Sequence, residues 1–376
     1  MLGVYVHIPF CARKCSYCDF HSVVAEGSMI EQYLQALANE IDHWARRVDG
    51  SVCTTLYLGG GTPTVLTSDQ LNRLLTSLVT AFDFQPGFEF TVEANPGTLT
   101  PDKAQVLTEA GVNRISLGAQ AYDNQLLRRI GRIHTADQIY TSVDLVRKSG
   151  IDNINLDLIE GLPGQTLRQW QATLKEAVQL EPAHISCYSL ILEENTPFYQ
   201  EYQAGKLSLP SEAAAADMFA CTQDYLPQMG YHHYEISNYA KPGRKAQHNL
   251  IYWQTYPYLG LGSGAHGYYN QIRYSNTDDL DQYIRSWLRH QPDWATWEPV
   301  DKDQAMDEMM FLGLRLVDGV DLNLFHQRFQ CSVHDVYGGE IDQLKNRGLI
   351  EENDGFLRLT MRGRALGNLV FSAFIR

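Results

Sequence analysis

Three cysteines lie close together near the start of the chain, in the pattern Cys11-x-x-x-Cys15-x-x-Cys18. Thiolates are the usual ligands of iron–sulfur clusters, so three of them on one short loop can hold three irons of a [4Fe–4S] cluster. The fourth iron would then lack a protein ligand and could bind an outside molecule, just as an open position marks a catalytic zinc site. Arg13 and Lys14 would place positive charge beside an anionic cluster.

The same spacing leaves two other interpretations open. One is a zinc knuckle with His7 or His21 as the fourth ligand, and the other is a set of buried thiols. The chain has seven cysteines, an odd number that argues against a disulfide scaffold. We expect the remaining four to be buried packing residues, because they are scattered: Cys53, Cys187, Cys221 and Cys331.

Composition indicates a globular protein. Of the 376 residues, 44% are hydrophobic and 20% are charged, which excludes a disordered chain. The net charge of −14 predicts no nucleic-acid partner, because phosphate contacts need clustered Lys and Arg. The amino-terminal segment lacks the basic region of a signal peptide, and no stretch approaches the ~18 apolar residues of a transmembrane helix. We expect a cytoplasmic protein with at most peripheral membrane association.

Six β-like runs alternate with amphipathic stretches through the first half of the chain, which predicts a parallel sheet with right-handed crossovers. Six units are too few for a closed eight-stranded barrel, so a partial barrel and a doubly wound sheet remain. The expected strands are Leu2–His7, Thr54–Leu58, Glu89–Ala94, Arg114–Ala119, Asn153–Ile159 and His184–Leu190. The expected helices are Met29–Arg47, Ser68–Phe82, Pro101–Ala110, Ala136–Ser149 and Leu167–Leu180.

The alternation of strand-like and helix-like stretches ends at about Glu194. We expect the Gly-, Tyr- and Asn-rich segment Ser237–Asn276 to form ordered loops. The boundaries predicted are a barrel at 1–236, loops with a connecting helix at 237–299, and a winged-helix-like domain at 300–376. Around and beyond those loops we expect helices at 211–229, 278–290, 303–316, 323–329 and 338–347, a strand at 231–235, and a hairpin of 348–351 with 355–360.

The cysteine pattern, with Tyr17 directly before the third cysteine, resembles the radical S-adenosylmethionine (SAM) superfamily. Leu58-Gly-Gly-Gly-Thr-Pro63 resembles the loop with which that superfamily binds the SAM amino group. The resemblance implies a partial (β/α)6 barrel whose cluster chelates SAM through the open iron and reduces it to a 5′-deoxyadenosyl radical. The positions that match SAM contacts of the branch containing oxygen-independent coproporphyrinogen III oxidase and its haem-chaperone relatives are Tyr5, Tyr17, Gly60, Gly61, Thr62, Glu93, Gln120, Arg132 and Asp157.

Glu93, Gln120 and Asp157 fall at the carboxyl ends of consecutive expected strands. Parallel barrels keep their ligand sites at those ends, and a carboxylate there can accept hydrogen bonds from an amine or from ribose hydroxyls. Each carboxylate taken singly could instead fix a loop.

Two features separate the members of this branch. The oxidase has a further cysteine two residues after the third ligand, where this chain has Phe20, and an amino-terminal extension that is absent before Tyr5 here.

The hexapeptide His248-Asn249-Leu-Ile-Tyr252-Trp253 resembles the HNxxYW motif of the haem chaperones. A neutral imidazole is a common axial ligand of haem and aromatic rings can pack on the macrocycle, so His248 is the preferred haem ligand and His266 a weaker one. The alternative for His248 is a histidine hydrogen-bonded within a loop.

The resemblance therefore implies a haem chaperone that carries a [4Fe–4S] cluster and SAM. It would bind haem and deliver it to haem-requiring proteins such as respiratory membrane enzymes, with dimerisation promoted by the cluster. The alternatives are an enzyme, oxygen-independent coproporphyrinogen III dehydrogenase, and a zinc-dependent structural module. The sequence leaves open whether the protein is an enzyme.

Overall fold

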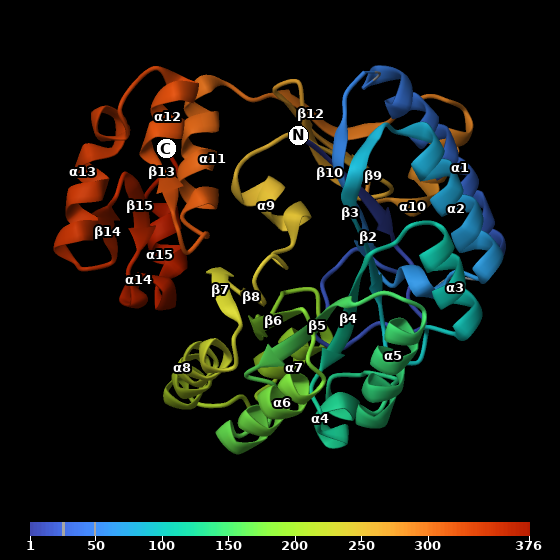
Figure 1. Cartoon of the computed structure of the whole chain (residues 1–376), viewed down its shortest axis with the longest axis horizontal. Coiled ribbons are helices and arrows are strands. Elements are labelled where there is room, and N and C mark those ends of the chain that lie inside the picture. Colours follow the sequence, from blue (N-terminus) through green and yellow to red (C-terminus); the bar gives the residue numbers. More distant parts are fainter. Residues whose placement is uncertain (25–26, 49) are drawn as a thin grey trace.

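The computed structural model describes residues 1–24, 27–48 and 50–376 (Figure 1). At its centre the six predicted strands pair in parallel and in chain order. They are β1 (Leu2–Ile8), β2 (Cys53–Gly60), β3 (Phe84–Ala94), β4 (Arg114–Gln120), β5 (Asn153–Glu160) and β6 (His184–Ser189). The prediction of these strands is confirmed, although β3 begins at Phe84 rather than Glu89.

Helices pack along the outside of this sheet, as the apolar faces of the predicted helices require (Figure 1). Local signals fix where they begin: Thr67 and Gln70 form a capping box, and the Thr100 side chain accepts from the Lys103 N–H. The helices of this region are α1 (Gly27–Arg47), α2 (Ser68–Ala81), α3 (Pro101–Glu109), α4 (Asn124–Arg129), α5 (Ala136–Lys148), α6 (Leu167–Gln179), α7 (Pro197–Gln203) and α8 (Glu212–Gln228), with the short 3-10 turn η1 (Pro63–Val65).

The expectation of ordered loops over Ser237–Asn276 is wrong. This segment contributes strands to the main sheet, whose order is β12-β11-β10-β9-β1-β2-β3-β4-β5-β6-β8-β7. The strands are short and glycine-rich because neighbours crowd them: a Cβ at Gly267 would lie 2.2 Å from the Tyr274 ring. The added elements are β7 (His232–Glu235), β8 (Asn238–Ala240), α9 (Gln247–Trp253), β9 (Tyr258–Leu261), β10 (His266–Tyr269), β11 (Ile272–Asn276), α10 (Leu280–Leu288) and β12 (Trp294–Pro299).

The carboxyl-terminal part has its own hydrophobic core and forms a separate lobe (Figure 1). Three helices precede a small hairpin, as the winged-helix-like prediction requires. The elements are α11 (Lys302–Gly313), β13 (Val320–Asp321), α12 (Leu322–Phe329), α13 (Val333–Asn346), β14 (Ile350–Asn353), β15 (Phe356–Leu359), α14 (Met361–Ala365) and α15 (Gly367–Ser372). We propose a domain boundary near residue 300, because the residues after it pack into a separate hydrophobic core. The segment 237–299 instead adds strands to the main sheet.

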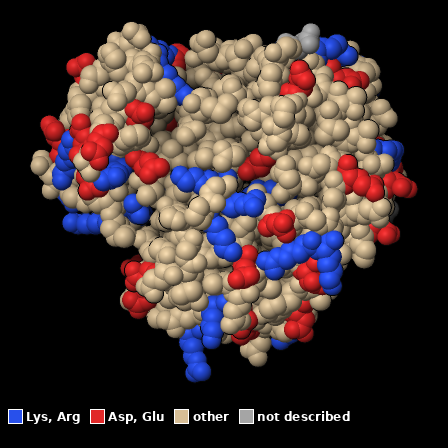
Figure 2. All heavy atoms as spheres, viewed as in Figure 1, with Lys and Arg blue, Asp and Glu red and all other residues tan. Residues whose placement is uncertain are grey.

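Charged side chains of both signs lie among one another on the face shown in Figure 2. Within residues 1–24, 27–48 and 50–376, no helix combines the length and the apolar character needed to cross a bilayer.

Candidate functional site

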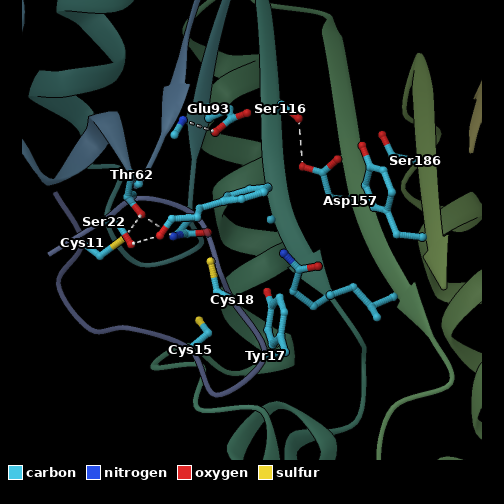
Figure 3. A pocket seen from close by; sticks show the side chains of 18 of the residues that line it. Cys11, Cys15, Tyr17, Cys18, Ser22, Thr62, Glu93, Ser116, Asp157 and Ser186 are labelled. Carbon is cyan, nitrogen blue, oxygen red and sulfur yellow. Dashed lines mark hydrogen bonds between the residues drawn. The ribbon is translucent and has the colours of Figure 1, made fainter. Parts of the chain in front are cut away.

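The three clustered cysteines lie on the loop between β1 and α1 and face one cavity of about 470 Å³ (Figure 3). The Cys11 N–H donates to the Val23 carbonyl at 2.9 Å, which closes the loop. The Arg132 guanidinium donates to the Cys15 sulfur at 3.6 Å. All three cysteines are free. The sequence pattern thus places three thiols at the carboxyl ends of the strands, where a parallel barrel binds its ligands.

The triple-glycine loop fits under this cysteine loop because it has no side chains. Gly60 has a φ of +105°, and a Cβ there would lie 2.4 Å from the His7 ring. A Cβ at Gly61 would lie 2.6 Å from the Phe10 carbonyl. The Gly60 N–H donates to Glu93 Oε2 at 3.1 Å. The glycines therefore allow a close backbone approach between β1, β2 and the carboxylate of β3.

Two half-buried carboxylates line the cavity from the strands on either side of β4, Glu93 on β3 and Asp157 on β5 (Figure 3). Glu93 accepts from the Tyr57 hydroxyl at 2.7 Å, and burial raises the pKa of Glu93 to about 7. Asp157 accepts from the Ser116 hydroxyl at 2.9 Å and from the Asn155 amide at 2.8 Å, while burial raises its pKa. Both carboxylates are held in fixed positions and face the ligand space.

The remaining predicted SAM contacts sit around the same cavity. Gln120 ends β4 with a φ of +66°, a strained conformation for a residue with a side chain. The Arg132 guanidinium donates to Asn95 Oδ1 as well as to Cys15. The structure brings together along the cavity wall Cys11, Cys15, Tyr17, Cys18, Gly60, Gly61, Thr62, Glu93, Gln120, Arg132 and Asp157.

Tyr5 on β1 is not among the residues that line this cavity, and its hydroxyl donates to His7 Nδ1 at 2.9 Å. His7 Nε2–H in turn donates to the His21 carbonyl at 2.8 Å, and His21 Nε2 bonds Ser263 Oγ at 3.1 Å. Both ring nitrogens of His7 are bonded within the protein, which argues against His7 as the fourth ligand of a zinc knuckle. In the part of the chain that the structure describes, no three His, Cys, Asp or Glu side chains are placed around one metal ion. A cluster imposes a different geometry, because its thiolates bind separate irons.

The HNxxYW motif forms α9, at the opposite end of the barrel from the cysteines. Glu89 caps this helix by accepting from the Gln247 and His248 N–H groups at 2.9 and 3.0 Å. His248 is 1% exposed and bonds Thr55 Oγ1 through Nδ1 at 2.7 Å and the Tyr252 hydroxyl through Nε2 at 2.8 Å. Burial lowers the pKa of His248 to about 3, so the imidazole is neutral.

The other members of the motif have different surroundings. Asn249 lines the inner end of the cavity. The Trp253 ring lies against the Arg315 guanidinium, 5.2 Å from the ring centroid, at the contact with the carboxyl-terminal lobe. The motif therefore joins the barrel interior to that lobe, and His248 lies behind the cavity wall.

Sequence reasoning missed several cavity residues on the inner face of the strands, among them Tyr57, Arg114, Ser116 and Asn155. A strand that is buried on both faces usually contains only apolar residues. Polar side chains within such a strand, as in Arg-Ile-Ser-Leu over 114–117, were therefore the available signal for these positions.

Comparisons with known proteins agree with this geometry. The radical SAM superfamily model matches residues 5–177, and the HemN C-terminal domain model matches residues 300–366. The heme chaperone HemW of Lactococcus lactis is 41% identical over 99% of this chain and 97% of its own length. That of Bacillus subtilis is 38% identical over 100% and 99%. The solved coproporphyrinogen III oxidase HemN of Escherichia coli superposes with a TM-score of 0.87 at 26% identity, over 99% of this chain and 89% of that chain.

The fold and site are those of a radical SAM protein, and a [4Fe–4S] cluster and SAM are accordingly its cofactors. Within that superfamily the chain belongs to the family of the heme chaperone HemW. The residues present fit the cofactors: three free thiols of the type that binds iron–sulfur clusters face one cavity, beside a glycine loop that side chains would block.

Proposed function

We propose that this protein is a haem chaperone that carries a [4Fe–4S] cluster and SAM. The full-length likeness to haem chaperones carries this proposal, since the oxidase shares the fold at a lower identity. The exposed side chain of Phe20 supports it: Phe20 lines the cavity mouth, at the position where the oxidase has a further cysteine.

We infer that Cys11, Cys15 and Cys18 would hold the cluster. A bound cluster supplies an electron to SAM. The Arg132 guanidinium, donating to Cys15, would offset the negative charge of the thiolates. The other residues that we assign to SAM are Tyr5, Tyr17, Gly60, Gly61, Thr62, Glu93, Gln120, Arg132 and Asp157.

The two carboxylates have the acceptor capacity for this role. Glu93 has one Tyr57 and one Gly60 donor on its two oxygens, which leaves lone pairs for a ligand amine or hydroxyl. With a pKa of about 7, Glu93 would ionise as a cationic ligand approaches, because an opposite charge favours the ionised carboxylate. Tyr5 would act through His7, to which its hydroxyl donates, because it is not among the residues that line the cavity.

We propose that His248 is the haem ligand, with Asn249, Tyr252 and Trp253 around the macrocycle. The imidazole is already neutral, as iron ligation requires. Its Nε2 bonds the Tyr252 hydroxyl, so ligation requires Tyr252 to move aside. The aromatic ring of Tyr57, 5.2 Å from that of His248 between centroids, would hold the imidazole in place from the barrel side.

Haem titration of the purified protein tests this proposal. Wild-type protein should develop a Soret band of histidine-ligated haem, and His248→Ala should lose that band or weaken haem binding at least about tenfold. His326→Ala is the control, because His326 is an exposed histidine on α12 that has no assigned role in haem binding. A Soret spectrum and affinity unchanged in His248→Ala would show that another residue ligates the iron.

The second candidate function is oxygen-independent coproporphyrinogen III dehydrogenase. The structural similarity to the oxidase, with a TM-score of 0.87, favours this candidate. Anaerobic protein with a reconstituted cluster, reductant, SAM and coproporphyrinogen III is the assay. We expect no carbon dioxide and no protoporphyrinogen IX under conditions in which SAM is cleaved. Release of both products would establish the oxidase instead.

We further propose that the protein works in the cytoplasm and delivers haem to haem-requiring proteins such as respiratory membrane enzymes, with dimerisation promoted by the cluster. Size-exclusion chromatography before and after anaerobic cluster reconstitution tests the dimer. An unchanged elution volume on reconstitution would remove that part of the proposal.

A further inference from the structure

His184 is buried in the barrel wall and uses both of its ring nitrogens. It begins β6, is 0% exposed, and stands opposite Asn155 of β5 in the parallel register. Burial lowers the pKa of His184 well below its usual value, so the neutral ring has one donor and one acceptor nitrogen. Nδ1–H donates to Asn155 Oδ1 at 2.6 Å, and Nε2 accepts from the Tyr234 hydroxyl at 2.7 Å. His184 is not among the residues that line the cavity, so it acts on a ligand there only through its neighbours.

On the cavity side, His184 sets the orientation of Asn155 and, through it, of Asp157. The Asn155 amide nitrogen donates to Asp157 Oδ1 and to Ser116 Oγ, both at 2.8 Å. Its amide oxygen also accepts from Ser186 Oγ at 3.2 Å, and Ser116 donates to Asp157 Oδ2 at 2.9 Å (Figure 3). An amide turned by 180° would present its oxygen to the Asp157 carboxylate, so the Nδ1–H of His184 fixes which way Asn155 faces.

On its other side, His184 is joined to α9, the helix of the HNxxYW motif, through Tyr234. Tyr234 lies on β7 and is 3% exposed. Its hydroxyl donates to His184 and accepts from the Ala246 N–H at 3.2 Å. Ala246 is the residue at which α9 begins, and it has no side chain that could cap the helix. The Tyr234 carbonyl also accepts from the Val317 N–H of the carboxyl-terminal lobe at 3.0 Å, so Tyr234 contacts the barrel interior, α9 and that lobe.

These hydrogen bonds form one unbroken chain in which every donor points toward Asp157. It runs from the Ala246 N–H through Tyr234, His184 and Asn155 to the Asp157 carboxylate. Hydrogen bonds joined in this way inside a protein polarise one another, so a change at one end of the chain alters the others. A ligand that donates to Asp157 therefore affects the start of α9.

We propose that His184 and Tyr234 are positioning residues that couple SAM bound at Asp157 to the HNxxYW helix α9. Coupling between two sites is reciprocal, so a ligand on α9 changes the affinity for SAM by the factor by which SAM changes the affinity for that ligand. His248, the residue that we assign to the haem iron, lies two positions after Ala246. The consequence for haem rests on the proposed haem-chaperone function, whereas the consequence for the helix does not.

Amide hydrogen exchange read by mass spectrometry tests the coupling without haem. Protein with an anaerobically reconstituted cluster is compared with and without SAM, and no reductant is added, so that SAM binds without being cleaved. SAM should change the exchange rate over residues 246–250 by about fivefold or more, the lower end of the usual coupling between sites. Tyr234→Phe breaks the chain by removing one hydroxyl and should abolish this change. Tyr231→Phe is the matched control and should keep the change, because it removes a buried hydroxyl that donates to the Pro182 carbonyl at 2.9 Å, outside the chain.

SAM affinity, measured by equilibrium dialysis, separates the positioning of Asp157 from its coupling to α9. His184→Leu should weaken SAM binding about tenfold, because Asn155 is then free to turn its oxygen toward the carboxylate. His184→Asn is the conservative variant: its amide can replace Nδ1 beside Asn155 but is too short to reach Tyr234. It should bind SAM within about twofold of wild type and yet lose the change in exchange over 246–250.

The proposal is overturned if SAM leaves the exchange of 246–250 unchanged in wild-type protein. It is also overturned if Tyr234→Phe keeps the change, since the effect would then bypass this chain, or if Tyr231→Phe loses it as well. If wild-type protein shows the change in exchange but binds no haem, the haem-chaperone function fails and the coupling of SAM to α9 stands.

Discussion

The sharpest test of the site geometry is Gly60→Ala, because two separate costs meet at this glycine. Its φ of +105° is a conformation that a residue with a Cβ rarely adopts. In addition, the new methyl group would lie 2.4 Å from the His7 ring. His7 cannot turn away cheaply, since its two ring nitrogens bond the Tyr5 hydroxyl and the His21 carbonyl.

The magnitude follows from separating these costs. A left-handed backbone conformation costs an alanine about 1–2 kcal/mol relative to glycine. Overpacking a well-filled interior by one methyl group adds about 1–3 kcal/mol. We therefore expect Gly60→Ala to lower the free energy of unfolding by about 2–5 kcal/mol. Gly230→Ala supplies the matched control: Gly230 has a φ of +84° and open space around its Cβ position, so it should lose only the backbone part.

Urea unfolding followed by tryptophan fluorescence measures both variants. Anaerobic equilibrium dialysis then measures SAM binding, which should weaken in Gly60→Ala alone, because the Gly60 N–H holds Glu93. If the two variants lose the same free energy and bind SAM equally well, the close approach between the glycine loop and His7 is not a feature of the protein in solution.

Two further outcomes are expected. Serine substitution of Cys11, Cys15 or Cys18 should abolish iron and sulfide retention after anaerobic reconstitution, whereas Cys221→Ser should retain both; retention in any of the first three would remove that residue from the ligand set. Burial raises the pKa of Glu40 to about 7, so its folded form binds a proton that the unfolded chain releases above about pH 4.5. The contribution of Glu40 to stability is therefore fully present below pH 4.5. It is lost as the pH rises to about 7, which lowers the free energy of unfolding by about 3 kcal/mol. Glu40→Gln should flatten this part of the stability–pH profile measured by urea unfolding, and a profile parallel to wild type would contradict the assignment.

The barrel could be predicted because its signals are local. The mostly apolar run Leu2–Ile8, which ends directly before Pro9, is recognisable from its own residues. The same holds for the cysteine loop and the glycine loop, whose neighbours along the chain suffice to place them at strand ends.

The segment after residue 237 could not be predicted in this way. Its strand β9 is only four residues long and pairs with β1, more than two hundred residues earlier in the chain. Strand pairing depends on which partner is available in space, and that information is absent from the composition of a short glycine-rich stretch.

The sequence by itself determined which side chains are available for chemistry: three thiols on one loop, a glycine turn and polar residues at the ends of consecutive strands. Only the tertiary structure decided how they meet. It placed the cysteines and the HNxxYW motif at opposite ends of one barrel, and it buried His248 between Thr55 and Tyr252. The physical reason is that residue spacing fixes contacts only within a turn or a strand. Burial, ion pairing and free hydrogen-bond capacity are set by neighbours that lie far apart along the chain.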